Sequence, residues 1–204
     1  LLFVSRRGIV KRTPLKAYAN VNKSGLIAVG LKEGDSLFDV RLTSGNDDVI
    51  LVTSAGMAIR FNEHEDRGGL RDMGRAAAGV KGIELIGPAE IVGTAIVPMI
   101  PDESWTPAAG ETEEDRPWVT DRARADKPTD LLTITDKGYG KRTDVDEYRV
   151  RSEREDGAVT LRSQSRGGKG RIDMRLGAKN GRPVSAFAVA DSDDVVVISR
   201  GGQL

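Results

Sequence analysis

The stretch ILVTSAGMAIRF, residues 50–61, contains the pattern that decides the fold. A run of mainly β-branched and aliphatic residues ends in a turn marked by Gly56, and a second run that carries Arg60 follows it. β-Branched residues favour pleated strands, and glycine accepts the positive φ of a tight hairpin turn. The stretch therefore predicts two antiparallel strands joined by a short turn.

The same pattern recurs along the chain. Residues 2–13 are LFVSRRGIVKRT, residues 131–143 are LLTITDKGYGKRT, and VVVISRGGQL begins a fourth run at Val195. Repetition of one unit predicts an array of equivalent supersecondary elements. The turn glycines of the four runs are Gly8, Gly56, Gly138 and Gly202.

Each hairpin is followed by a glycine, by a leucine six residues later, and then by another apolar run. The short runs LIAVG, VKGIE and RIDMR lie between that glycine and that leucine, and SLFDVRL, EIVGTAIV and PVSAFAV follow. We expect all of these runs to be strands, so each unit has about four strands, as a propeller blade has. The sequence therefore predicts an all-β, propeller-like disc with about three blades and the start of a fourth.

The spacing of the turn glycines sets the boundaries within this single domain, residues 1–204. The second interval is longer than one blade needs, and the surplus lies at 98–130. This insertion is rich in proline and acidic residues and lacks strand alternation, so we expect a long, mobile surface loop there. The predicted units are residues 1–48, 49–130, 131–194 and, in part, 195–204.

Composition restricts the class of protein. The chain has no cysteine, which excludes disulfides and thiolate metal sites, and it has 24 glycines, which suit a fold rich in turns. No apolar run approaches the roughly 20 residues that span a membrane, and no signal peptide is recognisable. We expect a cytoplasmic protein without a metal, a cofactor or a membrane partner.

Charge is segregated along the chain although the formal net charge is zero. The insertion is acidic, and the segments around the turns are basic. Local charge decides whether phosphate is attracted, because screening confines a field to about 10 Å at 0.1 M salt. The recurrence of cations after the turns favours the interpretation that they form a stripe of DNA-binding residues. The alternative is that they simply lie on strand faces exposed to solvent. The candidate DNA-binding residues are Arg6, Arg7, Lys11, Arg12, Arg60, Lys137, Lys141, Arg142, Arg166, Lys169 and Arg171.

Five stretches resemble one known family. They are GIVKRTPL from Gly8, EGDSLFDVRLTSGNDDVILVTSAGMAIRFNE from Glu33, MGRAAAGVKGIEL from Met73, TDKGYGKRTDVDEY from Thr135 and NGRPVSAFAVADSDD from Asn180. In this order they are similar to the C-terminal domain of the A subunit of bacterial DNA gyrase and to the related domain of topoisomerase IV. The resemblance implies a β-pinwheel whose blades exchange strands and whose basic rim binds duplex DNA at phosphates, with little reading of sequence.

The resemblance also implies a role. Such a domain is not catalytic, because the tyrosine that cleaves DNA belongs to a separate domain, and it needs no cofactor. It wraps DNA to support negative supercoiling, together with the remaining parts of the A and B subunits of gyrase, at the nucleoid. By the family's blade order the chain covers the second to fourth blades and the start of the fifth. The insertion at 98–130 departs from the family pattern.

The stretch QSRGGKG differs at one position from the family's signature QRRGGKG. In the family this loop closes the disc before the first blade and is needed for wrapping, whereas here it follows GYGKRT. We therefore expect it in the corresponding loop of a later blade, where glycines let the backbone approach phosphate. A plain glycine-rich connector is the alternative. The residues are Gln164, Ser165, Arg166, Gly167, Gly168, Lys169 and Gly170.

Two other functions remain open. A topoisomerase IV domain would bend DNA more weakly and favour decatenation. A propeller-like protein-interaction module would dock a protein through its rim or through the insertion, and the neutral net charge together with Trp105 and Trp118 supports that alternative.

Overall fold

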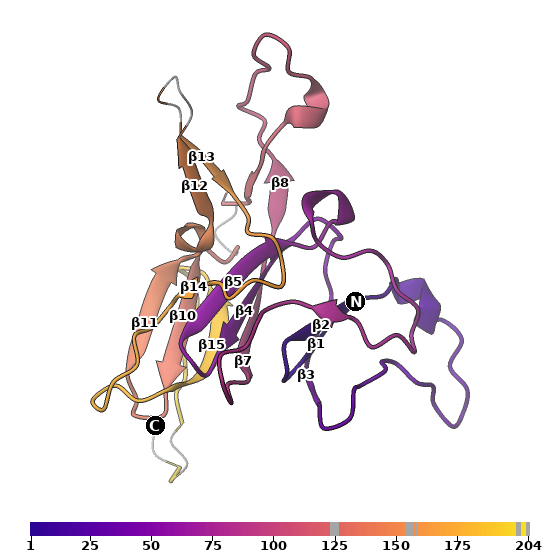
Figure 1. The fold of residues 1–204 in the computed structure, drawn as a ribbon, viewed down its shortest axis with the longest axis vertical. Coiled ribbons are helices and arrows are strands. Elements are labelled where there is room, and N and C mark those ends of the chain that lie inside the picture. The colour runs from indigo at the N-terminus through magenta and orange to yellow at the C-terminus, as the bar shows by residue number, and fades with distance from the viewer. Residues whose placement is uncertain (123–126, 154–156, 158, 199–200, 203–204) are drawn as a thin grey trace.

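A computed structural model describes residues 1–122, 127–153, 157, 159–198 and 201–202. Within them the regular structure consists of short strands and four single-turn 3₁₀ helices (Figure 1). The 3₁₀ helices are η1 (Leu15–Tyr18), η2 (Glu65–Arg67), η3 (Glu113–Asp115) and η4 (Val145–Tyr148). The strands are β1 (Leu2–Ser5), β2 (Ile9–Arg12), β3 (Leu37–Arg41), β4 (Asp48–Thr53), β5 (Met57–Asn62), β6 (Val80–Lys81), β7 (Ile91–Val97), β8 (Met99–Pro101), β9 (Trp118–Thr120), β10 (Asp130–Thr135), β11 (Gly140–Asp144), β12 (Val150–Glu153), β13 (Val159–Arg162), β14 (Arg171–Ile172) and β15 (Pro183–Val189).

The three predicted hairpins are confirmed as β1–β2, β4–β5 and β10–β11. All three turns have the same construction. The turn glycine has a φ of 74° to 76° and donates its N–H to the carbonyl of the last strand residue, which is Ser5, Thr53 or Thr135. The hydroxyl of that residue also accepts the N–H that follows the glycine. A short hydroxyl residue and a glycine three positions later therefore fix each turn.

The third strand of each unit pairs antiparallel with the first strand of its hairpin. These pairs are β1 with β3, β4 with β7 and β10 with β15. Each pair has one register shift, which falls directly before Ser5, Thr53 or Thr135. The predicted strands SLFDVRL, EIVGTAIV and PVSAFAV are thus confirmed, and the irregularity at the turn repeats with them.

The fourth strand of a blade comes from the next unit. β6 pairs with β2, and β14 pairs with β5, so residues beyond each hairpin complete the blade before it. The N–H groups of Ile83 and Met174 donate at equivalent positions to the carbonyls of Gly8 and Gly56. The exchange of strands that the sequence resemblance implied is confirmed.

Blades pack face to face through two apolar clusters. Strand β4 is buried along its whole length, because Val49 and Leu51 pack with the first blade while Ile50 and Val52 pack with the third. Each buried aliphatic side chain contributes about 1.5–3 kcal/mol. Blade contact through these side chains is therefore the main source of stability. The blades also share a single parallel bridge between β7 and β15.

Two expectations about strands are corrected. LIAVG, residues 26–30, is not a strand. Residues 195–198 of the fourth run are not in a strand either, and Val196 is 72% exposed. No strand of the described chain pairs with either run. Without backbone pairing to a neighbouring strand, their apolar side chains have no cross-strand side chains to pack against.

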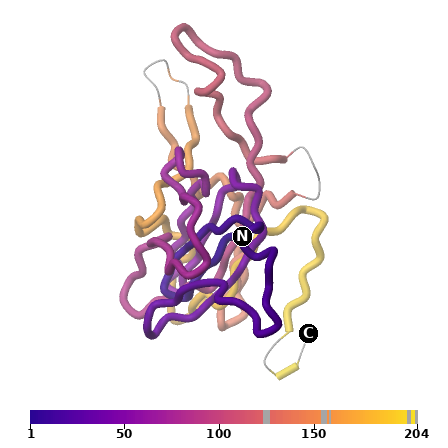
Figure 2. The backbone as a smooth tube through the Cα atoms, turned by 90° about the vertical axis from the view of Figure 1, so that its right-hand side faces the viewer, coloured from indigo at the N-terminus to yellow at the C-terminus, as the bar shows by residue number. Residues whose placement is uncertain are grey.

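The insertion is more ordered at residues 98–122 than its composition predicted, and residues 123–126 of the predicted loop lie outside the described residues. β8 and β9 pair as a ribbon, and Thr112 and Asp115 form a capping box around η3. The ribbon projects from the blades beside the β12–β13 hairpin (Figures 1 and 2). Its base also reaches the core, where Met99 and Thr120 are buried. The insertion is therefore not a separable surface loop.

The two turn glycines Gly56 and Gly138 offer a matched test of the strand exchange. Both have positive φ, but a Cβ on Gly56 would lie 2.1 Å from the Met174 carbonyl oxygen, whereas a Cβ on Gly138 meets nothing within 4 Å. We expect Gly138→Ala to lower the free energy of unfolding by about 1–2 kcal/mol, the cost of the left-handed backbone. Gly56→Ala should cost clearly more in urea denaturation. Equal losses would contradict the tight contact between units.

Candidate nucleic-acid interface

The predicted DNA-binding residues separate into buried and exposed groups. Lys11 and Arg60 have relative exposures of 1% and 0%, so the prediction that they lie on the rim is wrong. Arg12 and Arg166 are half-buried. The exposed residues are Arg6, Arg7, Lys137, Lys141, Arg142, Lys169 and Arg171.

Lys11 connects two loops from the inside of the first blade. Its ammonium donates to the carbonyls of Ala28 at 3.1 Å, Gly74 at 3.3 Å and Arg75 at 2.5 Å. It also lies 4.9 Å from the ring centroid of Phe3. Burial lowers the pKa of Lys11. A lysine whose three protons are all donated to carbonyls has none left for phosphate.

The arginine that comes four residues after the turn glycine has a structural role in every unit. Arg12 pairs with Asp72 at 2.8 Å, Arg60 pairs with Asp48 at 2.6 Å, and Arg142 pairs with Asp130 at 2.7 Å. Arg142 also pairs with Asp191. Each of these recurring arginines is therefore engaged by a carboxylate, but only the pair of Arg60 and Asp48 is fully buried, whereas Asp72 and Arg142 are exposed.

Arg60 is the most completely bonded of these arginines. Its five N–H groups donate to Asp48, the Val145 carbonyl, Asp146, the Met99 sulfur and the Thr120 hydroxyl, at 2.6–3.3 Å. The side chain thus joins the second blade, the base of the insertion and η4 of the third blade. Burial disfavours the charged form of Asp146, but Arg60, Arg122 and Arg149 together lower the pKa of that carboxyl.

The signature-like loop, residues 164–170, docks on residues 81–84 of the preceding unit. Gly167 N–H donates to the Gly82 carbonyl at 2.6 Å, and Glu84 N–H donates to the Gly168 carbonyl at 2.8 Å. We call this contact the glycine junction, comprising residues 81–84 and 164–170. Arg166 supports it by donating to the carbonyls of Gly69 and Lys81.

Two exposed lysines flank the glycine junction. A Cβ on Gly167 would lie 3.9 Å from Cδ of Lys81, so the Lys81 side chain runs beside the loop that carries Lys169. No ion pair of Lys81 or Lys169 with a carboxylate occurs among the described residues. Sequence reasoning chose Lys169 but missed Lys81, because it lies outside the recurring hairpin. Lys81 occupies the repeat position of Ile172, so the repeat gave no signal for a cation there.

A second basic group lies at the outer strands of the third blade. Lys141 donates to the Asp173 carbonyl at 2.6 Å, and Lys137 donates to the Ala178 carbonyl. A shallow hollow of about 470 Å³ lies between Lys141 and Arg175. Arg171 donates to the carbonyls of Glu147 and Arg149 and is exposed. The structure thus brings Lys141 and Arg175 together at the hollow, while Lys137 and Arg171 are exposed on neighbouring segments.

Arg6 and Arg7 form a separate pair in the first turn. Arg6 lies 3.4 Å from Glu90 and 5.5 Å from the ring centroid of Phe38, and the Arg7 guanidinium runs beside Gly34. No contact joins this pair to the other exposed predicted cations in the described chain.

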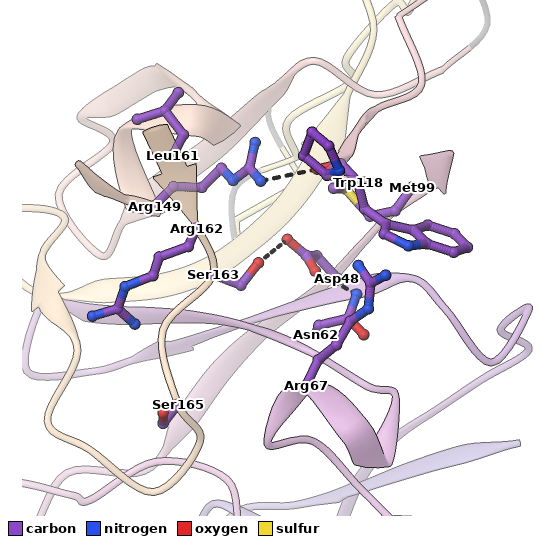
Figure 3. A pocket seen from close by; sticks show the side chains of 11 residues that line it. Asp48, Asn62, Arg67, Met99, Trp118, Arg149, Leu161, Arg162, Ser163 and Ser165 are labelled. Atoms are coloured by element: carbon purple, nitrogen blue, oxygen red, sulfur yellow. Dashed lines mark hydrogen bonds between the residues drawn. The ribbon is translucent and has the colours of Figure 1, made fainter. Parts of the chain in front are cut away.

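Figure 3 shows an arginine-lined cavity of about 310 Å³ that the sequence did not indicate. Arg67 lies 4.4 Å from the ring centroid of Trp118, and Arg149 donates to the Trp118 carbonyl at 3.0 Å. Burial lowers the pKa of both arginines. Because neither arginine recurs in the repeat, the sequence offered no signal for the cavity. Its other lining residues are Asp48, Asn62, Met99, Pro117, Leu161, Arg162, Ser163 and Ser165.

The described part of the chain offers neither a metal cluster nor a helix that could span a membrane. No group of three or more His, Cys, Asp or Glu side chains there could hold a metal ion. None of its helices is long and apolar enough to cross a membrane.

Comparison with known proteins identifies the family. Two strand-exchanging blades of four strands and a third of three described strands, with exposed cations on their loops, define a propeller-like class. The family model described as "DNA gyrase C-terminal domain, beta-propeller" matches residues 1–44, 47–98, 129–152 and 158–190. The chain therefore belongs to the DNA gyrase C-terminal domain family. Residues 99–128 of the insertion lie outside the match.

Individual relatives agree with this assignment. The chain is 37% identical over 201 residues to the DNA gyrase A subunit of Haloquadratum walsbyi, and 35% identical over 202 residues to that of Staphylococcus epidermidis. These alignments cover 98% and 99% of the chain but only 18% of each relative.

Two solved structures share the fold. A DNA gyrase A C-terminal domain matches with a TM-score of 0.67 at 20% identity, over 99% of this chain and 53% of that one. The C-terminal domain of a DNA topoisomerase IV matches with a TM-score of 0.56 at 23% identity, over 94% of this chain and 62% of that one.

Arg60 and Arg142 occupy the same repeat position and differ in burial, which makes them a matched pair. We expect Arg60→Met to lower the free energy of unfolding by about 3–5 kcal/mol, because Asp48 is left buried without its cation. Arg142→Met removes an ion pair whose arginine is 48% exposed and should cost about 0–1 kcal/mol. Urea denaturation measures both. A small loss for Arg60→Met would mean that the buried pair does not hold the blades together.

Proposed function

We propose that this chain binds duplex DNA with little sequence preference, as the DNA-wrapping part of a DNA gyrase A subunit. The observation that carries the proposal is the glycine junction, where Lys81 and Lys169 are exposed beside glycine backbone. Family membership supplies the context, because the matched relatives are subunits of DNA gyrase.

The chemistry of the glycine junction suits a phosphate backbone. Lysine ammonium groups attract phosphate as mobile point charges, and glycines leave room for a backbone to approach. Gly167 has a φ of 84°, so the loop turns sharply beside Lys169. Arg166 adds a positive charge, although its guanidinium also holds the loop in place. Phosphate contacts of this kind carry affinity without sequence information.

The basic group of the third blade would extend the DNA path. Lys141 and Arg175 line an open hollow, and Arg171 and Lys137 are exposed near it. Arg6 and Arg7 add a third exposed group at the first turn. Lys11 and Arg60 are left out of the proposed contact set, because their protons are donated within the protein.

The lack of sequence preference follows from the kinds of element present. Strands and short loops carry the cations, and no described helix is long enough to enter a major groove as a recognition helix. Aromatic residues make up 4% of the chain, so base stacking contributes little. DNA that follows several basic groups would be bent, and the energy of bending would come from phosphate contacts.

The larger assembly belongs to the proposal as well. The chain would act without a catalytic residue or a cofactor of its own, in the cytoplasm, beside the remaining parts of the A and B subunits. That complex would carry out the ATP-dependent reaction of a type II topoisomerase. A topoisomerase IV role in decatenation is the alternative, and the relatives at 35–37% identity, which are gyrase A subunits, favour gyrase.

Salt dependence tests the proposal. Binding to a random-sequence duplex should weaken steeply with salt, with a log–log slope of about −0.9 for each phosphate neutralised. The double variant Lys81→Ala/Lys169→Ala should bind more weakly and flatten that slope by about 1.8 if each lysine contacts one phosphate. Its free energy of unfolding should stay within about 0.5 kcal/mol of the parent.

The matched control is Lys23→Ala/Lys32→Ala, which removes the same charge from two exposed lysines between β2 and β3. It should leave the slope nearly unchanged. Equal effects of the two double variants would show that only the overall charge matters. An affinity that does not vary between low and physiological salt would rule out DNA wrapping by this chain.

A further inference from the structure

A groove lies between the insertion and the β12–β13 hairpin. Both of these elements project beyond the blades (Figures 1 and 2). The volume of the groove is about 580 Å³. Three consecutive residues of β9 line one wall, and three consecutive residues of β13 line the other. The side chains of neighbouring strand residues point to opposite faces of a sheet. A groove wall that is lined by consecutive residues of a strand is therefore formed by the edge of that strand and not by one of its faces. The groove is thus bounded by two strand edges.

Both edges are open for pairing. β9 pairs only with β8, and β13 pairs only with β12, among the described residues. Asp102 N–H donates to the Pro117 carbonyl across the ribbon, and Asp121 N–H donates to the Pro98 carbonyl. Because bonding alternates along an antiparallel pair, the N–H and C=O of Trp118 point to the outer edge. Arg149, at the foot of the hairpin, donates to that carbonyl.

The lining of the groove combines apolar and acidic side chains. Trp105, Trp118, Val159 and Leu161 supply the apolar surface, and Leu161 is 40% exposed. The carboxylates are Asp102, Glu111, Asp115 and Asp146. The cations that line it are Arg122 and Arg149. Arg122 is paired with Asp144 and Asp146, and Arg149 bonds the Trp118 carbonyl.

The insertion is acidic beyond the groove as well. Seven carboxylates and two arginines occur in residues 98–122. DNA phosphate is repelled by such a segment, whereas a cationic peptide is attracted to it. Residues 99–128 of the insertion also lie outside the segments that the family model matches.

We propose that this groove binds an extended, lysine- or arginine-rich segment of a partner protein by strand addition. The peptide backbone pairs with the open edge of β9 or β13, and its cations face Asp102 and Asp115. Alternate apolar side chains pack on Trp118 and Leu161. Main-chain pairing supplies affinity, and the side-chain pockets supply the preference for a basic, apolar sequence.

Tryptophan fluorescence reads this site directly, because the chain has two tryptophans and both line the groove. The probe is an acetylated, amidated peptide of about seven residues, the length of a typical strand, in which arginine alternates with leucine or valine. Titration in about 0.15 M salt should shift the emission to shorter wavelength and saturate. A peptide of equal charge with a central proline should bind at least about tenfold more weakly, because proline cannot donate to a strand edge.

The matched variants are Leu161→Lys in the groove and Leu37→Lys in β3, where Leu37 is 41% exposed. Both add one positive charge to an exposed strand leucine. Leu161→Lys should raise the Kd of the peptide by about tenfold or more, and Leu37→Lys should leave it nearly unchanged. Circular dichroism confirms that both variants are folded.

Three results would overturn the proposal. The proline peptide could bind as tightly as the parent peptide, which would leave only charge attraction to the insertion. Leu161→Lys and Leu37→Lys could weaken binding equally, which would place the peptide elsewhere. A DNA duplex could produce the same saturable shift in tryptophan emission, which would make the groove part of the DNA path.

Discussion

The buried guanidinium of Arg60 is the interaction on which the arrangement of the blades depends. It donates every N–H it has, to a carboxylate of its own blade, to η4 of the next blade and to the base of the insertion. A buried cation is tolerated only when it is paired and fully bonded. Asp48 and Asp146 therefore cannot move away from the guanidinium of Arg60. Their positions fix the angle between the second and third blades.

The hairpins, the turn glycines and the exchange of strands were predictable, because each depends on local pattern or on the family resemblance. The burial of Arg60 was not, because its partner Asp146 is 86 residues away. A charged residue that recurs in register has the same appearance in sequence whether it faces solvent or a neighbouring blade. The β8–β9 ribbon was missed because strands of three residues are too short to show alternation.

This division between internal and exposed cations changes where function is sought. The fold uses Lys11, Arg12 and Arg60 to hold loops and blades, so recurrence in the sequence does not by itself mark a DNA contact. Exposed lysines that do not hold loops or blades lie at the glycine junction and in or beside β11, where a phosphate backbone has access. The acidic insertion offers strand edges and apolar surface, which suit a peptide. The second and third units together thus carry two surfaces of opposite charge.

Lysine acetylation with and without duplex DNA, quantified by mass spectrometry, tests this division most directly. The account predicts that Lys81, Lys141 and Lys169 react in the free protein and are protected when DNA is bound. Lys11 should be unreactive in both states, because it is 1% exposed and donates to three carbonyls. A reactive Lys11 that DNA protects, or exposed lysines that DNA leaves unprotected, would contradict the account.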